Sequence, residues 1–225
     1  MTAEIRGFDQ AARNAADAQS LLATVEGAMA EQHNLLQRIR EIAVQAASGT
    51  NSGADRDALQ SEANALEAEI ERISNDTTWA EIQVLNATQD SGTFKFHIGP
   101  DGSDTITYTI IDMGIDNTNG IAISTGRVVT TQALANAYIG ILDNAISMVG
   151  TKRNEVGGIM NRLDHTMANL SNMVTNLSLA KGRVEDADFA AESANLARTQ
   201  VLQQASMSML AQANASKQNI LALFQ

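Results

Sequence analysis

The chain has 225 residues, of which 44% are hydrophobic but only 4% aromatic, and its formal net charge at pH 7 is -11. Because aromatic side chains bury the most area per residue, so few of them do not fill a thick globular core, and the composition favours thin seams between closely packed helices. The negative charge argues against a phosphate-binding protein, in which clustered Lys and Arg are expected, and the absence of cysteine excludes disulfides and thiolate chemistry.

Residues 3–47 are predicted to form one long helix. Apolar or small residues recur there mostly at steps of three and four, with a register shift near Leu22 and a polar Gln32 at one seam position. The Ser, Gly and Asn residues of 48–53 end the pattern. Two arginines, Arg38 and Arg40, stand among the apolar positions just before this stop, and they mark either a binding surface or the solvated side of a bundle.

A second helix is predicted for residues 55–74, since its apolar residues are spaced four, three, four and three apart. They are Leu59, Ala63, Leu66, Ile70 and Ile73. The carboxylate-rich stretch 67–76 is expected to be a solvated helix face on which Glu69 and Arg72 form a compatible pair. The polar residues from Asn75 to Thr78 end the helix.

The middle of the chain changes character. Apolar and polar residues alternate on both sides of a Gly-Pro-Asp-Gly turn, which predicts a β-hairpin within residues 92–112. The alternation places Phe94, Phe96 and Ile98 on one strand and Ile106, Tyr108 and Ile110 on the other. The segment GIAIS at 120–124 is a candidate for one more short strand.

From about residue 131 a helical pattern returns and extends over six heptads. One seam consists of Ile139, Ile146, Arg153, Met160, Met167 and Val174; the other consists of Leu142, Val149, Val156, Leu163, Leu170 and Leu177. Such a sustained repeat predicts coiled-coil-like packing. At 1.5 Å per residue the run is about 58 Å long, which implies a rod with the first helix as antiparallel partner. Gly157 and Gly158, inside the repeat, are interpreted as a place of close helix approach.

The last segment is predicted to be a separate helix, because Gly182 interrupts the repeat and Asp186 and Asp188 are candidate N-caps. Residues 199–216 carry no charge, yet their glutamines make them too polar for a membrane span. Such a helix is expected to be buried against other copies of the chain or against a partner.

No catalytic or metal-binding constellation is expected. His33, His97 and His165 stand far apart and fit no metal-ligand spacing. The stretch 98–104 lacks the residues of a phosphate or calcium loop and is interpreted as a turn. From the residues present we expect no signal peptide and no membrane-spanning helix. The chain is therefore predicted not to be an enzyme and to use no cofactor or metal.

The sequence resembles bacterial flagellin. The resemblance rests on LQRIREIAVQAASGTNS, on QSEANALEAEIERISNDTTW and on the run from VGTKRNEVGGIMNRLDHTMANL to QVLQQASMSMLAQANASKQNILALF. It implies a mainly α fold, an elongated antiparallel helical bundle or coiled-coil rod with a small β-hairpin insert. In such proteins the terminal segments form rod and inner tube and the middle faces outward. The N-terminal segment of the family is expected to be missing from this chain.

The resemblance implies four parts: rod helices in 1–90, a short β-rich variable insert in 91–130, a C-terminal rod helix in 131–181 and an inner-tube helix in 182–225. It implies a secreted, extracellular filament subunit for motility. The implied partners are other flagellin subunits, the flagellin export chaperone, hook-associated and cap proteins and the host Toll-like receptor 5; nucleic acid binding and membrane insertion are not implied. A hook–filament junction protein or a flagellin-like cell-surface binding protein remain the alternatives.

Two sets of residues are implied to make contacts. The receptor or subunit interface would comprise Gln37, Arg38, Glu41, Ile42, Gln45, Leu59 and Glu62. The polymerisation and chaperone segment would comprise Val201, Leu202, Met209, Leu210, Ile220 and Leu221. In the first set, Arg38, Ile42 and Gln45 are four and three residues apart, so one helix face is expected to carry all three.

Overall fold

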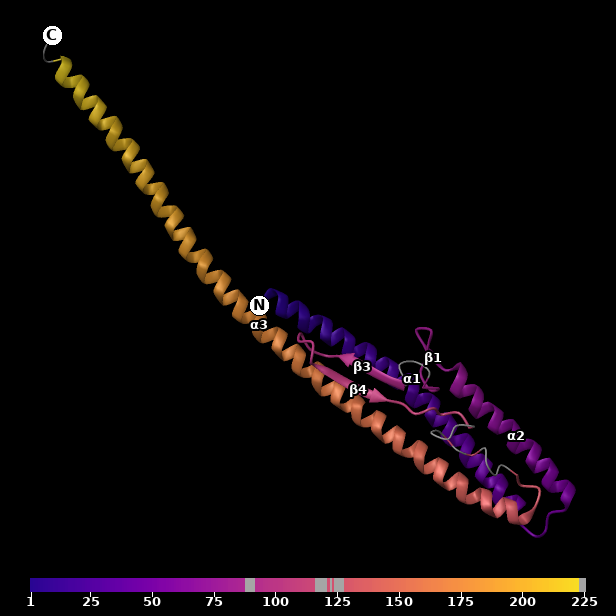
Figure 1. Ribbon diagram of the computed structural model, residues 1–225. Helices are drawn as coiled ribbons and strands as arrows, with labels where there is room; N and C mark the ends of the chain where they lie inside the picture. The colour runs from indigo at the N-terminus through magenta and orange to yellow at the C-terminus, as the bar shows by residue number, and fades with distance from the viewer. Residues whose placement is uncertain (88–91, 116–120, 122, 124–127, 223–225) are drawn as a thin grey trace. The chain divides into compact units, whose positions relative to one another are not determined.

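The computed structural model describes residues 1–87, 92–115, 121, 123 and 128–222, the side chains of 186–188 and 216–222 excepted. It contains three long helices and two short hairpins (Figure 1). They are α1 (Thr2–Ala46), α2 (Gly53–Asp76), β1 (Thr78–Trp79), β2 (Ile82–Gln83), β3 (Thr93–His97), β4 (Thr105–Thr109) and α3 (Gln132–Ala222). The predicted mainly helical fold with a small β-hairpin is confirmed.

The chain divides into two compact units. A bundle unit comprises residues 6–173, and a terminal unit comprises residues 1–5 and 174–225. Helix α3 contributes its first part to the bundle unit and its second part to the terminal unit.

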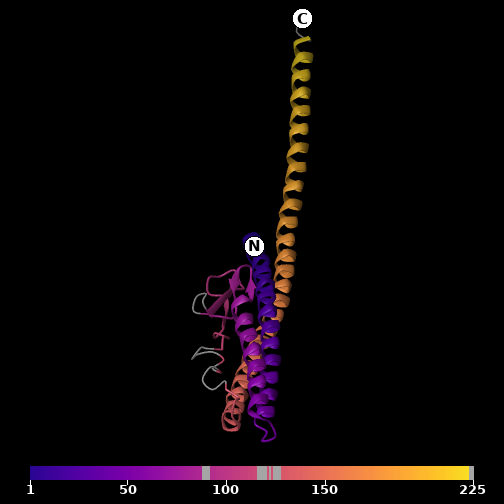
Figure 2. The ribbon, with the colours of Figure 1, turned by 90° about the vertical axis from the view of Figure 1, so that its right-hand side faces the viewer.

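Three helices form the bundle unit. Helices α1, α2 and the first part of α3 run alongside one another, with α3 antiparallel to α1 (Figures 1 and 2). One α3 seam is buried at every seventh residue: Ala135, Leu142, Val149, Val156, Leu163 and Leu170. Ile139 and Met160 of the other seam are only half-buried and pack at the margin of the core. The heptad pattern therefore identified the central seam correctly from Leu142 to Leu170, whereas Leu177, also predicted for this seam, is only half-buried, and Ala135 was not predicted.

A polar corner joins α1 to α2. Ser52 caps α2: its hydroxyl accepts a hydrogen bond from the Asp55 N–H, and the Asp55 carboxylate accepts one from the Ser52 N–H. This capping box satisfies two amides that the helix itself leaves free. Arg56 then reaches back, and its guanidinium donates to the carbonyls of Ala46 and Ser48 at 2.8 and 2.9 Å. The same short segment therefore ends one helix and begins the next.

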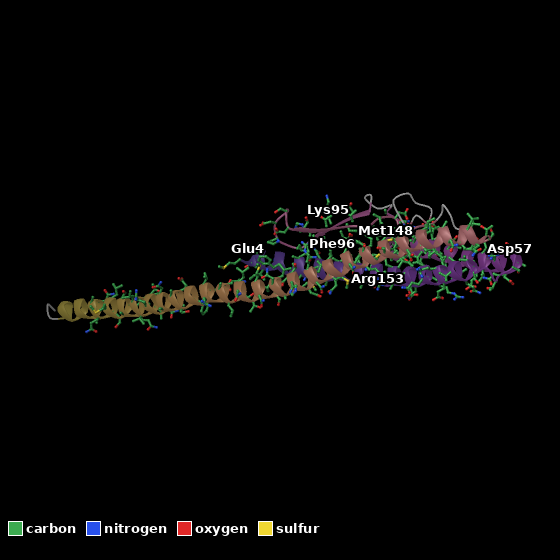
Figure 3. The ribbon with its side chains drawn as sticks, turned by 90° about the horizontal axis from the view of Figure 1, so that it is seen from below. Glu4, Asp57, Lys95, Phe96, Met148 and Arg153 are labelled. Atoms are coloured by element: carbon green, nitrogen blue, oxygen red, sulfur yellow. The ribbon has the colours of Figure 1, made fainter. Side chains whose placement is uncertain are left out.

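The β3–β4 hairpin covers one side of the helices in the bundle unit. Phe94 pairs with Tyr108 and Phe96 with Ile106, as the alternation predicts. Figure 3 shows Lys95 on the side of the hairpin away from the helices and Phe96 on the side facing them. Glycine is required at residue 99, because a Cβ there would collide with the side chain of Asp104.

A second hairpin, with strands of two residues each, was not predicted from the sequence. It consists of β1 and β2, and both turn residues between them, Ala80 and Glu81, have positive φ. A turn with two such residues usually contains Asn or Gly, so the sequence carried no usual signal for it.

Two expectations about α3 are wrong. The helix does not restart near Gly182, Asp186 and Asp188 but continues unbroken to Ala222. One glycine costs a helix only about 1 kcal/mol, which a long helix tolerates. Gly157 and Gly158 are not at a close helix approach either, since nothing lies within 4 Å of a Cβ placed at either residue. The strand considered at 120–124 falls largely outside the described residues.

Candidate functional site

Arg38 is the centre of a charged cluster on the surface of the bundle unit. Its Nη2 donates to Glu62 Oε1 of α2 at 2.7 Å, and its Nη1 donates to Glu41 Oε2 of α1 at 2.9 Å. The hydrogen bonds to Glu62 and then to Glu41 raise the pKa of the guanidinium above its ordinary value. All three side chains remain substantially exposed, so the ion pairs orient the cluster more than they stabilise the fold.

Most of the predicted interface residues lie around this cluster, with one exception. Gln37 and Gln45 are exposed, and Leu59 is half-buried against the core. Ile42 is fully buried, so the prediction that it shares an exposed face with Arg38 and Gln45 is wrong. A residue four positions along a helix is rotated by about 40°. Arg38 lies just outside the narrow apolar stripe of α1, so a rotation of this size is enough to place Ile42 inside the stripe and in the core.

The second arginine of this stretch has a different role. Arg40 Nε donates to Asp143 Oδ1 of α3 at 2.6 Å and so bridges α1 to α3. Arg153, which breaks the predicted α3 seam and is labelled in Figure 3, similarly donates to Glu26 of α1 at 2.7 Å. Both arginines therefore help to hold two helices together within the bundle unit.

Buried polar groups also connect the elements of the bundle. Tyr138 on α3 donates to the carboxylate of Glu67 on α2 at 2.6 Å, and Glu67 is only 2% exposed. The prediction of a solvated face is therefore wrong at Glu67, although Glu69 and Arg72 form the expected exposed pair at 2.6 Å. Sequence reasoning missed the Glu67–Tyr138 contact because the two residues lie 71 positions apart.

The terminal unit exposes apolar side chains on the uncharged stretch 199–216 of α3. Val201 and Leu202 are 64% and 58% exposed, and Met209 and Leu210 are 72% and 63% exposed. Ile220 and Leu221, which were also predicted for the polymerisation and chaperone segment, lie on the same helix, and the structure describes only their backbone. Large apolar groups left in water favour association, because covering them releases free energy in proportion to their area.

Neither a metal centre nor a membrane-spanning helix is found in the part of the chain that the structure describes. Within it, no group of three or more His, Cys, Asp or Glu side chains is placed to hold a metal ion. No helix in that part is long and apolar enough to cross a membrane.

Comparison with protein families matches both ends of the chain. Residues 1–90 match the family described as "Bacterial flagellin N-terminal helical region", and residues 139–224 match "Bacterial flagellin C-terminal helical region". The chain is 38% identical to a flagellin of Halalkalibacterium halodurans over all of its own length and 81% of that protein.

Comparison with solved structures also shows similarity to flagellar proteins. A crystal structure of Bacillus cereus flagellin matches with a TM-score of 0.63 and 32% identity, over 75% of this chain and 94% of that one. A putative flagellar hook-associated protein from Vibrio parahaemolyticus matches with a TM-score of 0.68 over 80% of this chain and 92% of that one, but at 16% identity this likeness concerns the fold alone. The chain belongs to the bacterial flagellin family and is a structural subunit of the flagellar filament, not an enzyme.

Proposed function

We propose that this filament subunit polymerises mainly through residues 182–225, with the α1–α2 surface around Arg38 as a second contact region. The observation that carries this proposal is the exposed apolar set on the uncharged stretch 199–216, which includes Leu202 and Met209. Residues 199–216 gain by covering their apolar side chains, and this stretch carries no charge whose desolvation would oppose burial. In the extracellular filament, neighbouring subunits would cover it.

Before export, the same segment would be covered by the flagellin export chaperone. In the finished flagellum, hook-associated and cap proteins would contact the first and last subunits of the filament. The rod helices of 1–90 and 131–181 would pack against neighbouring subunits, and the insert of 91–130 would face outward. These assignments rest on membership of the family and on the exposed apolar set.

Hydrogen exchange tests the polymerisation segment. In the monomer, backbone amides of residues 195–225 are expected to exchange fast, and in filaments they are expected to be strongly protected. Leu202→Asp places a charge in the apolar set and is expected to prevent assembly. It should leave the unfolding midpoint of the bundle unit unchanged, because Leu202 contributes nothing to that core. Strong protection of this segment in a monodisperse monomer, or normal assembly of Leu202→Asp, would contradict the proposal.

We also propose that the surface around Arg38 is a recognition site for Toll-like receptor 5. The surface combines an arginine, two carboxylates and the half-buried Leu59, a mixture typical of an interface centre with a polar rim. The primary role of this surface would be to pack against the next subunit, so the receptor would bind a surface that assembly covers. Ile42 would support this surface from below and would not contact the receptor itself.

Receptor signalling by purified monomers tests this site. Arg38→Ala and Glu62→Ala are each expected to weaken receptor binding, and with it the response, about fivefold or more, which corresponds to about 1 kcal/mol or more of binding free energy. Arg72→Ala is the matched control, because Arg72 is also an exposed arginine of the bundle paired with carboxylates, Glu69 and Asp76, but lies outside the site. Equal signalling by all variants would remove Arg38 and Glu62 from the site, and a silent wild-type protein would exclude receptor recognition altogether.

A further inference from the structure

A groove of about 450 Å³ lies beside β4 in the bundle unit. Residues of β4 form one wall, and α3 forms the other. Thr107, Tyr108 and Thr109 line the first wall, and Gly158, Ile159 and Arg162 line the second. None of the contacts proposed above uses this groove.

The outer edge of β4 has unpaired backbone groups. Ile98 donates its N–H to Asp104, and Ile110 donates its N–H to Gly92, so these opposed residues are hydrogen-bonded pairs. In an antiparallel ladder such pairs alternate along the strand. The N–H and C=O groups of Thr107 and Thr109 therefore point away from β3, and no hydrogen bond to them is found among the described residues. An open edge of this kind is a template for another strand.

Tyr108 lines the same groove and has a buried hydroxyl. Tyr108 is 1% exposed, and its hydroxyl has no hydrogen-bond partner in the described structure. Burial raises the pKa of this phenol, and the nearby negative charge of Glu155 raises it further, so the group remains a neutral donor. A buried polar group without a partner destabilises a fold, and its persistence calls for an explanation. A ligand whose polar group reaches past the lining side chains to this hydroxyl would supply the missing partner.

The α3 wall offers an apolar side chain, open space and a free positive charge. Ile159 packs partly against the core. Gly158 has nothing within 4 Å of a Cβ position, which leaves room beside the helix. Lys152 is neutralised by Glu155 at 2.8 Å, whereas the Arg162 guanidinium has no ion-pair partner among the described residues.

We propose that this groove binds an extended peptide segment of a partner protein, which adds to β4 as a third strand and places a carboxylate on Arg162. An extended chain repeats its donors and acceptors in register with those of Thr107 and Thr109. Its inward side chains would cover Ile159, and one of its polar groups would accept from Tyr108. A small anion could pair with Arg162 but would leave both threonine amides free, so the peptide satisfies more of the site.

The test uses the full chain as a monomer and a designed probe. The probe is a blocked peptide of about nine residues in which valine and threonine alternate around a central aspartate, a length typical of a strand. NMR-detected exchange is measured for individual amides with and without millimolar peptide. The Thr107 and Thr109 amides are expected to exchange at least about tenfold more slowly with peptide, since the new strand covers them.

Four variants separate docking from folding. Thr107→Pro removes an outward N–H that the β3 ladder does not use and is expected to abolish binding. Lys95→Pro is the matched control: Lys95 lies directly opposite Thr107 and its N–H points to the outer edge of β3, away from the groove, so binding is expected to persist. Arg162→Gln should remove the preference for the aspartate peptide over its asparagine analogue. Tyr108→Phe should weaken binding while making the chain more stable, a combination that a purely structural residue does not give.

Three outcomes would overturn the proposal. The first is unchanged exchange at Thr107 and Thr109 in the presence of millimolar peptide. The second is equal binding by Thr107→Pro and the wild type. The third, which also decides the matter if the proline variant does not fold, is an aspartate preference that survives Arg162→Gln.

Discussion

Replacing Leu163 by Ala tests the central seam of the bundle unit. Leu163 is fully buried in the core cluster, between the half-buried Met160 and Met167. The substitution removes three carbon atoms, which corresponds to about 2.4 kcal/mol of lost transfer free energy at 0.8 kcal/mol per group. A residual cavity adds to this, and the two flexible methionines fill part of it, so we expect a loss of about 3 kcal/mol in the free energy of unfolding.

Urea unfolding followed by fluorescence measures this loss. The single tryptophan, Trp79, packs against the same core and reports on the bundle unit. The unfolding midpoint is expected to fall without a change in slope. Leu134→Ala is the matched control: Leu134 lies on the same helix but is 42% exposed, so its removal should cost less than about 0.5 kcal/mol. A loss below about 1 kcal/mol for Leu163→Ala, or equal losses for the two variants, would refute the assignment of the buried seam.

Three further predictions concern the same unit. Tyr108→Phe should raise the free energy of unfolding by about 1 kcal/mol, because it removes an unpaired buried hydroxyl. The raised pKa of Tyr108 also means that wild-type stability is complete below the ordinary tyrosine pKa of 10.0 and falls as the pH rises above it; a pH series should show a smaller alkaline loss for Tyr108→Phe, and equal losses would contradict the assigned burial. Gly158→Ala should stabilise the chain by about 0.5–1 kcal/mol in thermal or urea unfolding, because α3 has open space there, whereas a destabilised variant would indicate a hidden contact. Ser52→Ala should cost about 1 kcal/mol through the lost cap, and Ser52→Gly only a few tenths; equal costs would show that the cap is not formed.

The arginines near the end of α1 show what a local sequence pattern predicts and what it does not. The steps of three and four predicted the helix and its apolar stripe, but they did not distinguish the partner of Arg38 from that of Arg40. Arg38 pairs with Glu62, 24 residues away, and Arg40 pairs with Asp143, 103 residues away. Ile42 was misplaced for a related reason. The width of the buried stripe depends on how many helices pack around α1, which is a property of the assembled unit.

By itself, the sequence determined α1, α2, the first part of α3 and the main hairpin, because the repeats of 3.5 and two residues are set by backbone geometry and are visible in any short window. The absence of cysteine and the conspicuous uncharged stretch at 199–216 are likewise properties of the sequence alone. Only the tertiary structure decided that Glu67 is buried against Tyr138, that Gly158 faces open space and that Tyr108 lies unpartnered beside an open strand edge. Each of these depends on contacts between segments far apart in the chain. Such contacts form only when loops close and whole faces pack, and no local period of residues encodes which groups then meet.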